Sequence, residues 1–500
     1  MTNGVGRSLT QNTAVMVLTQ IITWGSTFVL MIVLPRTLGS EEYGRIFVAV
    51  SVAMVLDVFI AFGGQYHITK EISLGRRDPG EIIGNAMALR AGLWSAGFAA
   101  LFLFARLSGY GRDLLFMIMI LGTAKLWEGA TTVLRCYFQG IEKMEYPSAG
   151  AIAERVLLTT AGVGVLLRGG RGIAIAAVMG LASLVNFCLT AFLARKFLRG
   201  AMRVSLASVR ALLREGLPYF LWTIFAVVYY RIDAVMLTAM CPPAVVGWYG
   251  VAYRFFDVLM FLPSIFAGAL FPILARLRAA EGGAELERTT QRSIDLVIMA
   301  GIPVALGVFA CAPGIVSLFF GLGDYGPAII LLRVLVAGLP LVYINFVLAA
   351  TIVSGDRQRS WSLVAAAAIP INVALNYVLI PYWQSRAGNG GVGAALATLV
   401  TEDYVMIAGI FLASRSVFGS LRAAPILKAL CAGGVMGGVI LAADRLGAPR
   451  AAGTIAAALA YGSALLALRS FSPAELRTIR STLSPRGWKG AYFHRGELRA

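Results

Sequence analysis

Charged residues are scarce in this 500-residue sequence: Asp, Glu, Lys and Arg together make up 14% of it, and there are only two histidines. Soluble domains carry about 25% charged residues, so a chain this poor in charge cannot cover its surface in water. Apolar residues make up 58% of the sequence and are not confined to one stripe of each helix. The composition therefore excludes a soluble protein and indicates a membrane protein.

The sequence also lacks the patterns of metal and nucleotide sites. Its five cysteines stand singly, with no C-x-x-C pair and no histidine cluster nearby, and we interpret them as packing residues. There is no G-x-x-x-x-G-K-[ST] motif, and the one G-x-G-x-x-G match, at 321–326, lies between two apolar segments rather than after a strand. We expect no cofactor, no metal and no catalytic residues.

Long apolar segments follow one another along most of the chain. Segments such as 15–34, 46–62, 296–320 and 334–353 are long enough to cross a hydrocarbon core of ~30 Å as helices. The first segment has no small-residue cleavage site before Pro35, so we expect it to be retained. The sequence predicts an all-α polytopic membrane protein with about 14 transmembrane helices.

The net charge of +18 is distributed unevenly over the connections between these segments. Counting the N-terminus, the even-numbered connections and the C-terminal tail gives roughly 25 Lys and Arg, against roughly 8 in the odd-numbered connections. The positive-inside rule then predicts a multi-pass protein of the cell inner (cytoplasmic) membrane with both termini cytoplasmic, and the charge needs no nucleic acid partner to explain it. Every expected extracytoplasmic connection is short, so no soluble catalytic domain fits there and we expect no enzyme.

The two halves of the sequence are weakly similar. LGSEEYG at 38–44 and its apolar continuation correspond to the turn 241–247 with its continuation YGVA at 249–252. A six-plus-six duplication follows, with a cavity between two helical bundles. The predicted domains are an N-terminal six-helix bundle (1–194), a cytoplasmic amphipathic linker helix (195–215), a C-terminal six-helix bundle (216–413), helices 13 and 14 (414–468) and a basic cytoplasmic tail (469–500).

Several short motifs occur in a characteristic order: LGSEEYG at 38–44, FQGIEKMEY at 138–146, VGWYGVAYRF at 246–255, SGDRQR at 354–359 and GVGAALAT at 391–398. In these motifs the chain resembles the polysaccharide flippases of the multidrug/oligosaccharidyl-lipid/polysaccharide exporter superfamily, which include O-antigen flippases. The resemblance implies a cationic central cavity and a lipid-diphosphate-linked glycan as cargo. It also implies membrane lipids, and a glycan polymerase and glycosyltransferases of the same pathway, as partners.

Ionisable residues within the apolar segments are the best pointers to a site, because a charge in lipid is costly unless it faces a cavity or a partner. Arginine suits a phosphate group because its planar fork binds two oxygens and keeps its proton. Our candidates for binding the anionic head group are Arg231, Arg254, Arg90 and Lys125. Our candidates for coupling to an ion are Asp57, Asp233 and Asp295.

The same charges have a plainer explanation. Lys125 with Glu128, and Arg254 with Asp257, have the i,i+3 spacing at which opposite charges meet on a helix, and Arg231 is close in sequence to Asp233. Local neutralisation of these six charges therefore stays an alternative to a substrate site.

The function predicted from these observations is a flippase that moves a lipid-diphosphate-linked oligosaccharide, a precursor of an O-antigen or exopolysaccharide, from the inner to the outer leaflet by alternating access. A cation-coupled multidrug exporter and a peptidoglycan lipid-precursor flippase of the same superfamily stay open as alternatives. Cationic drugs require a mainly acidic cavity, and the basic residues here favour an anionic cargo. A membrane glycosyltransferase is disfavoured because no sizeable extracytoplasmic loop is expected.

Overall fold

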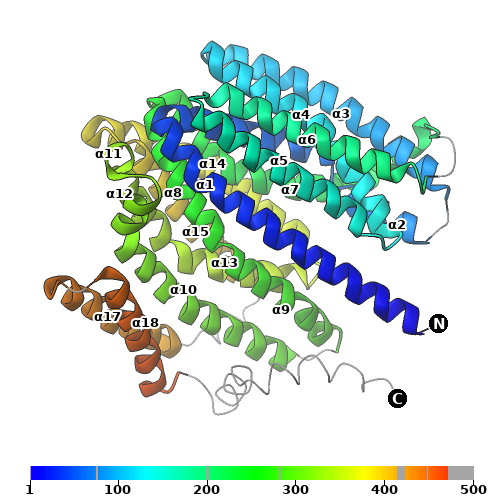
Figure 1. Cartoon of the computed structure of the whole chain (residues 1–500). Helices are drawn as coiled ribbons and strands as arrows, with labels where there is room; N and C mark the ends of the chain where they lie inside the picture. Colours follow the sequence, from blue (N-terminus) through cyan, green and yellow to red (C-terminus); the bar gives the residue numbers. More distant parts are fainter. Residues whose placement is uncertain are drawn as a thin grey trace. The chain divides into compact units, whose positions relative to one another are not determined.

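Figure 1 shows the computed structural model of the chain, which describes residues 2–74, 77–198, 202–280, 283–413, 423–447 and 449–470. The elements in these ranges are all helices, which confirms the predicted all-α fold. They are α1 (Thr2–Ala61), α2 (Gln65–Leu74), α3 (Pro79–Leu107), α4 (Arg112–Gly140), α5 (Glu145–Leu167), α6 (Gly172–Ala194), α7 (Leu206–Met240), α8 (Pro243–Leu259), α9 (Phe261–Ala279), α10 (Gly283–Phe319), α11 (Leu322–Tyr325), α12 (Ala328–Ala337), α13 (Leu339–Val353), α14 (Gln358–Ala387), α15 (Gly391–Ala413), α17 (Ala423–Arg445) and α18 (Arg450–Ala467).

Eleven of the described helices are long and apolar enough to cross a membrane, or up to twelve if α12 and α13, which meet at a bend of 42°, form one span. This count takes Leu18–Ala61 of α1 as a single span of 44 residues. A straight helix of that length is about 66 Å long, twice the thickness of a hydrocarbon core. Gly39 breaks α1 with φ 75° and ψ 170°, a conformation that glycine adopts without steric cost. The polytopic fold is confirmed, and the number fourteen stays approximate.

The helices form two compact units. The first contains Met1–Leu259, Ile315–Leu335 and Asp356–Ala408, and the second contains Met260–Gly314, Val336–Gly355 and Gly409–Ala500. This grouping does not follow the sequence-based boundaries at 194 and 216, and the six-plus-six division stays a prediction. The basic tail falls outside the described residues apart from its first two positions.

The predicted linker segment 195–215 does not form a separate helix among the described residues. Residues 202–205 are non-helical, and α7 then begins at Leu206 and continues without a break to Met240. Where the structure describes the predicted segment, only its second half, from Leu206 onward, is helical, and it forms the first turns of α7.

In the first unit, α4 packs against both α3 and α6, and α6 packs against α5 (Figure 1). The helix α1 contacts α5, α4 and α8, and α7 contacts α14. In the second unit, α9 packs against α13, and α17 and α18 pack as a pair (Figure 1). Small residues allow several of these close approaches, as is usual between membrane helices.

Odd-numbered connections meet one another within the first unit. Asp324, in the connection that contains α11, accepts hydrogen bonds from Ser40 at the break in α1. Glu42 accepts a hydrogen bond from the backbone N–H of Gly172 (2.9 Å), and the side chain of Asn389 donates to the carbonyl of Pro327 (3.2 Å). These contacts bring four odd-numbered connections together at one end of the unit. They are the first (the break in α1), the fifth (between α5 and α6), the ninth (between α10 and α12) and the eleventh (between α14 and α15).

Even-numbered connections likewise meet one another. The side-chain oxygen of Asn85, near the start of α3, accepts from the backbone N–H of Ser205 (2.7 Å). The ammonium of Lys143 lies 4.1 Å from the centre of the Phe197 ring. The odd-numbered connections thus lie at one end of the unit and the even-numbered connections at the other. This is the arrangement expected of a chain that crosses a membrane repeatedly.

Candidate functional site

Arg231 of α7 forms an ion pair with Asp257 of α8, with 3.4 Å between nitrogen and oxygen. Its guanidinium also lies 5.5 Å from the centre of the Tyr253 ring, within the range of a cation–π contact. Its side chain is 14% exposed. The partner is therefore a carboxylate on the neighbouring helix, and not the sequence neighbour Asp233.

Arg254 of α8 also lies near this carboxylate. It interacts with Asp257 and with the hydroxyl of Tyr43, which lies in the second part of α1. Tyr43 is buried. Two candidate arginines from two helices thus lie near one aspartate.

The candidates in the N-terminal half form a second cluster. Lys125 and Glu128 of α4 form the ion pair expected from their i,i+3 spacing. Asp57 of α1 interacts electrostatically with both of them and with Arg90 of α3. Lys125 consequently adds no net charge of its own, as the plainer explanation predicts.

Arg90 is 5% exposed and donates a hydrogen bond of 2.6 Å to the carbonyl of Gly129 in α4. Its other terminal nitrogen has no hydrogen-bond partner among the described residues. A buried guanidinium with an unused donor is costly in a membrane interior, and this donor can form a hydrogen bond to an anion.

Asp233 of α7 is 2% exposed and lies in a cluster of neutral polar groups. It accepts hydrogen bonds from Asn376 (2.6 Å), Thr398 (2.7 Å) and Tyr249 (2.9 Å). Asn376 also donates to the side-chain oxygen of Asn372 (2.7 Å). Within the described ranges, Asp233 makes no ion pair with a Lys or Arg. The oxygens of aspartate, asparagine and threonine together are suited to a small cation.

Asp295, the remaining coupling candidate, belongs to α10 in the second unit. It accepts a hydrogen bond from Gln291 (2.9 Å) and lies 3.7 Å from Arg292 on the same helix. Its charge is compensated locally, unlike that of Asp233.

A cavity of about 430 Å³ lies among α1, α3 and α7, and we call it the apolar groove. Arg231 is the one charged residue in its lining. The other lining residues are apolar: Val52, Val55, Leu56, Phe59, Ala96, Gly97, Ala100, Leu101, Phe104, Ile224, Val228, Ile232 and Val235.

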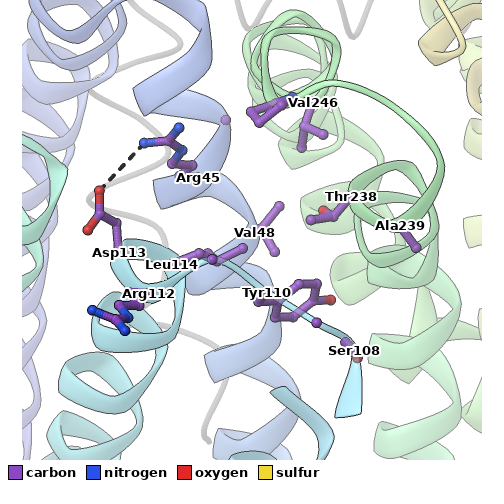
Figure 2. A pocket seen from close by; sticks show the side chains of 14 residues that line it. Arg45, Val48, Ser108, Tyr110, Arg112, Asp113, Leu114, Thr238, Ala239 and Val246 are labelled. Atoms are coloured by element: carbon purple, nitrogen blue, oxygen red, sulfur yellow. Dashed lines mark ion pairs between the residues drawn. The ribbon is translucent and has the colours of Figure 1, made fainter. Parts of the chain in front are cut away.

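A second cavity, of about 560 Å³, has both polar and apolar residues in its lining, and we call it the end pocket. It lies where the connection between α3 and α4 meets the second part of α1, the end of α7 and the start of α8. Figure 2 shows Arg45 joined to Asp113 by an ion pair, and Tyr110 extending toward the side where Thr238 and Ala239 lie. The sequence does not single out this pocket, because its residues come from four separate segments.

Sequence reasoning takes Asn372 and Asn376 as positions for close packing and hydrogen bonds between helices, and the structure confirms the hydrogen bonds: Asn376 donates to Asp233 of α7, and Asn372 donates to Thr401 of α15 (3.5 Å). It missed Tyr249 and Thr398 as partners of Asp233. Both lie inside the quoted motifs VGWYGVAYRF and GVGAALAT, so the motifs marked the positions without revealing their role.

Comparisons with known proteins agree with this architecture. The solved structure described as "Lipid II flippase MurJ, inward closed conformation" has a TM-score of 0.74 at 12% identity, covering 91% of this chain and 98% of that one. An inward-facing multidrug resistance MATE family transporter of the MOP superfamily has a TM-score of 0.66 at 16% identity, covering 79% and 96%. At these identities the likeness shows the fold.

In sequence, the chain is similar to the probable flippase AglR of Haloferax volcanii, with 26% identity over 210 residues. The match spans 40% of this chain and 40% of that protein. A family model described as MatE matches residues 218–378. The model described as polysaccharide biosynthesis protein matches residues 9–278, more than half of the chain, and the chain therefore belongs to the polysaccharide biosynthesis protein family, within the MOP superfamily of transporters.

Proposed function

We propose that this protein is a flippase that carries a lipid-diphosphate-linked oligosaccharide from the inner to the outer leaflet of the cytoplasmic membrane by alternating access. Membership of the polysaccharide biosynthesis protein family supports a glycan cargo, and the similarity to a probable flippase supports the transport class. We propose the same orientation as the charge distribution predicts, with both termini cytoplasmic.

The observation that carries the proposal is the pair of arginines around Asp257. Arg231 of α7 pairs with this carboxylate, and Arg254 of α8 interacts with it electrostatically, so two guanidinium groups lie near one aspartate. A diphosphate carries two to three negative charges and would cost many kcal/mol to move through a low-dielectric interior without compensation. Arg231 and Arg254 supply that compensation, with Asp257 keeping them in place when no cargo is bound.

Arg90 and Lys125 have different parts in this proposal. Arg90 offers a free donor in the buried cluster with Asp57, and a phosphate oxygen can accept from it. Lys125 is neutralised by Glu128, so it contributes only if that ion pair opens during transport.

Asp233 is the coupling site that we propose. Its carboxylate and the surrounding neutral oxygens suit a sodium ion or a proton, and binding there alters contacts among α7, α8, α14 and α15 at once. Asp57 and Asp295 are weaker candidates, because each lies beside a basic residue.

The apolar groove gives the lipid part of the cargo a place beside Arg231. An isoprenoid or acyl chain in the groove would place its phosphate near the guanidinium, since Arg231 lines the same cavity. This arrangement favours a lipid-linked anion over the cationic substrates of a multidrug exporter. A lipid II flippase fits the same chemistry, and the likeness in fold keeps it as the second candidate.

The test is complementation in a bacterium that has lost the flippase for its surface polysaccharide. Expression of this protein should restore the polysaccharide and lower the amount of lipid-linked oligosaccharide that accumulates on the cytoplasmic leaflet. A parallel strain depleted of its lipid II flippase separates the two cargoes. Rescue of drug resistance alone, with no glycan export in either strain, would overturn the proposal in favour of a multidrug exporter.

A further inference from the structure

The end pocket lies outside the clusters proposed to carry the diphosphate. Its lining comes from the odd-numbered connections and the helix ends next to them, which the proposed orientation places on the extracytoplasmic side. A volume of about 560 Å³ is within the range of small-molecule sites and is large enough for a short saccharide. The pocket is therefore positioned to meet the sugar part of the cargo after the membrane has been crossed.

Tyr110 provides a rigid ring at this pocket. Phe104 packs edge-on against it, with 6.1 Å between ring centres. Burial raises the pKa of Tyr110, so the phenol stays protonated and keeps a donor for a sugar hydroxyl. An aromatic ring with a polar tip suits the apolar face and the hydroxyl rim of a sugar ring.

Two of the charged residues that line the end pocket, Arg45 and Arg112, are basic, and one, Asp113, is acidic. Arg45 pairs with Asp113 (3.8 Å) and also with Glu41 and Glu42 on its own helix. Arg112, exposed at the start of α4, forms no ion pair with any described residue. Its planar fork is therefore free to bind a carboxylate in two-point fashion.

We propose that the end pocket binds an acidic saccharide, with the sugar ring against Tyr110 and its carboxylate at Arg112. The inference rests on the proposed function, since it assigns the pocket to the glycan of the translocated lipid. Val48, Thr238 and Val246 complete the wall opposite the charged residues (Figure 2). Binding there retains the glycan on the outer side and favours completed transport over return of the lipid.

The test uses the purified full-length protein in detergent micelles and two probes. One is a disaccharide of glucuronic acid and N-acetylglucosamine, and the other is neutral N,N′-diacetylchitobiose. Saturation-transfer difference NMR should show the acidic disaccharide binding, and the neutral one binding more weakly. Tyr110→Ala and Arg112→Ala should each weaken the acidic probe about tenfold, the effect of losing one ring contact or one charged pair.

The control is a second tyrosine–arginine pair on the same side. Arg386 lies 5.1 Å from the ring of Tyr382 in α14, and neither residue lines the end pocket. Tyr382→Ala and Arg386→Ala should leave binding unchanged. Absence of binding to both probes, or equal binding by the wild type and Tyr110→Ala, overturns the inference, and equal affinity for both probes overturns the preference for an acidic sugar.

The outcome is separable from that of the proposed function. Complementation by a protein that binds neither disaccharide would leave the flippase assignment intact and remove the end pocket as a glycan site. Binding that depends on Tyr110, in a protein that restores no glycan export, would retain the saccharide site and remove the flippase assignment.

Discussion

Asp324 and Ser40 are 284 positions apart in the chain, yet the Asp324 carboxylate accepts hydrogen bonds from both the backbone N–H (2.5 Å) and the hydroxyl (2.8 Å) of Ser40. Ser40 directly follows the break at Gly39, so the carboxylate caps the second part of α1. The backbone carbonyl of Asp324 also accepts from the Trp248 indole (2.7 Å). Asp324 therefore fastens α1 and α8 at the end where the odd-numbered connections meet.

Removal of this carboxylate should loosen that end. Each hydrogen bond to a charged group contributes about 1.5–3 kcal/mol to stability. Asp324→Ala should therefore increase, by about tenfold or more, the fraction of molecules in which α1 and α8 separate at this end. The measurement is the rate at which a membrane-impermeant maleimide labels Val48→Cys, in a background without the native cysteines. Asp444→Ala is the control, because Asp444 is an exposed residue at another odd-numbered connection. Equal labelling rates in all three proteins would show that Asp324 does not hold this end closed.

Gly247 of α8 should tolerate no side chain in this closed arrangement. A Cβ at Gly247 would collide with the backbone carbonyl of Ser40, which cannot move aside as a flexible side chain could. Gly247→Ala should therefore cost about 1–3 kcal/mol of the closed state and raise the labelling of Val48→Cys. Gly437→Ala, at a site with open space around it, should leave both labelling and thermal stability unchanged. A Gly247→Ala protein that labels like the wild type would contradict the close approach.

Arg231 and Arg254 both interact with the carboxylate of Asp257, so replacing one arginine also changes the charge balance around the other. Arg231→Ala should reduce glycan export at least tenfold, since one of two compensating charges is lost and Asp257 then neutralises the other. Arg231→Lys should restore part of it, because a lysine keeps the charge and loses the two-point fork. Export is measured as surface polysaccharide per cell at matched protein levels. Arg168→Ala, exposed at the end of α5, is the matched control, and full export by Arg231→Ala would remove this residue from the site.

Asp233 and Asp295 can be separated by their response to sodium. If Asp233 holds a cation, sodium should raise the thermal unfolding temperature of the wild type relative to equal potassium, because a ligand bound only to the folded state stabilises it. Asp233→Asn should abolish that difference. Asp295→Asn should retain it, since Asp295 is already paired with Arg292. A sodium effect that survives Asp233→Asn would exclude this carboxylate as the sodium site, and a wild type insensitive to sodium would leave a proton as the coupling ion to test.

The i,i+3 pair of Lys125 and Glu128 illustrates what could be read from sequence. Helix geometry fixes which residues on one helix face each other, so this ion pair follows once the segment is known to be helical. The all-α membrane fold follows in the same way, because hydropathy and segment length are local properties of the chain. The break in α1 could be located as well, since the loop motif around Gly39 interrupts an apolar run.

Partners on different helices depend on the rotation and vertical offset of each helix, which local sequence does not specify. Sequence proximity suggested that Arg231 pairs with Asp233. In the structure Arg231 pairs with Asp257 instead, and Asp233 accepts hydrogen bonds from Asn376 and Thr398. The sequence by itself determined a helical membrane protein with ionisable residues of both signs inside its apolar segments. Only the tertiary structure decided which of those charges are neutralised, because a carboxylate compensates whichever cation the packing of the helices brings within reach.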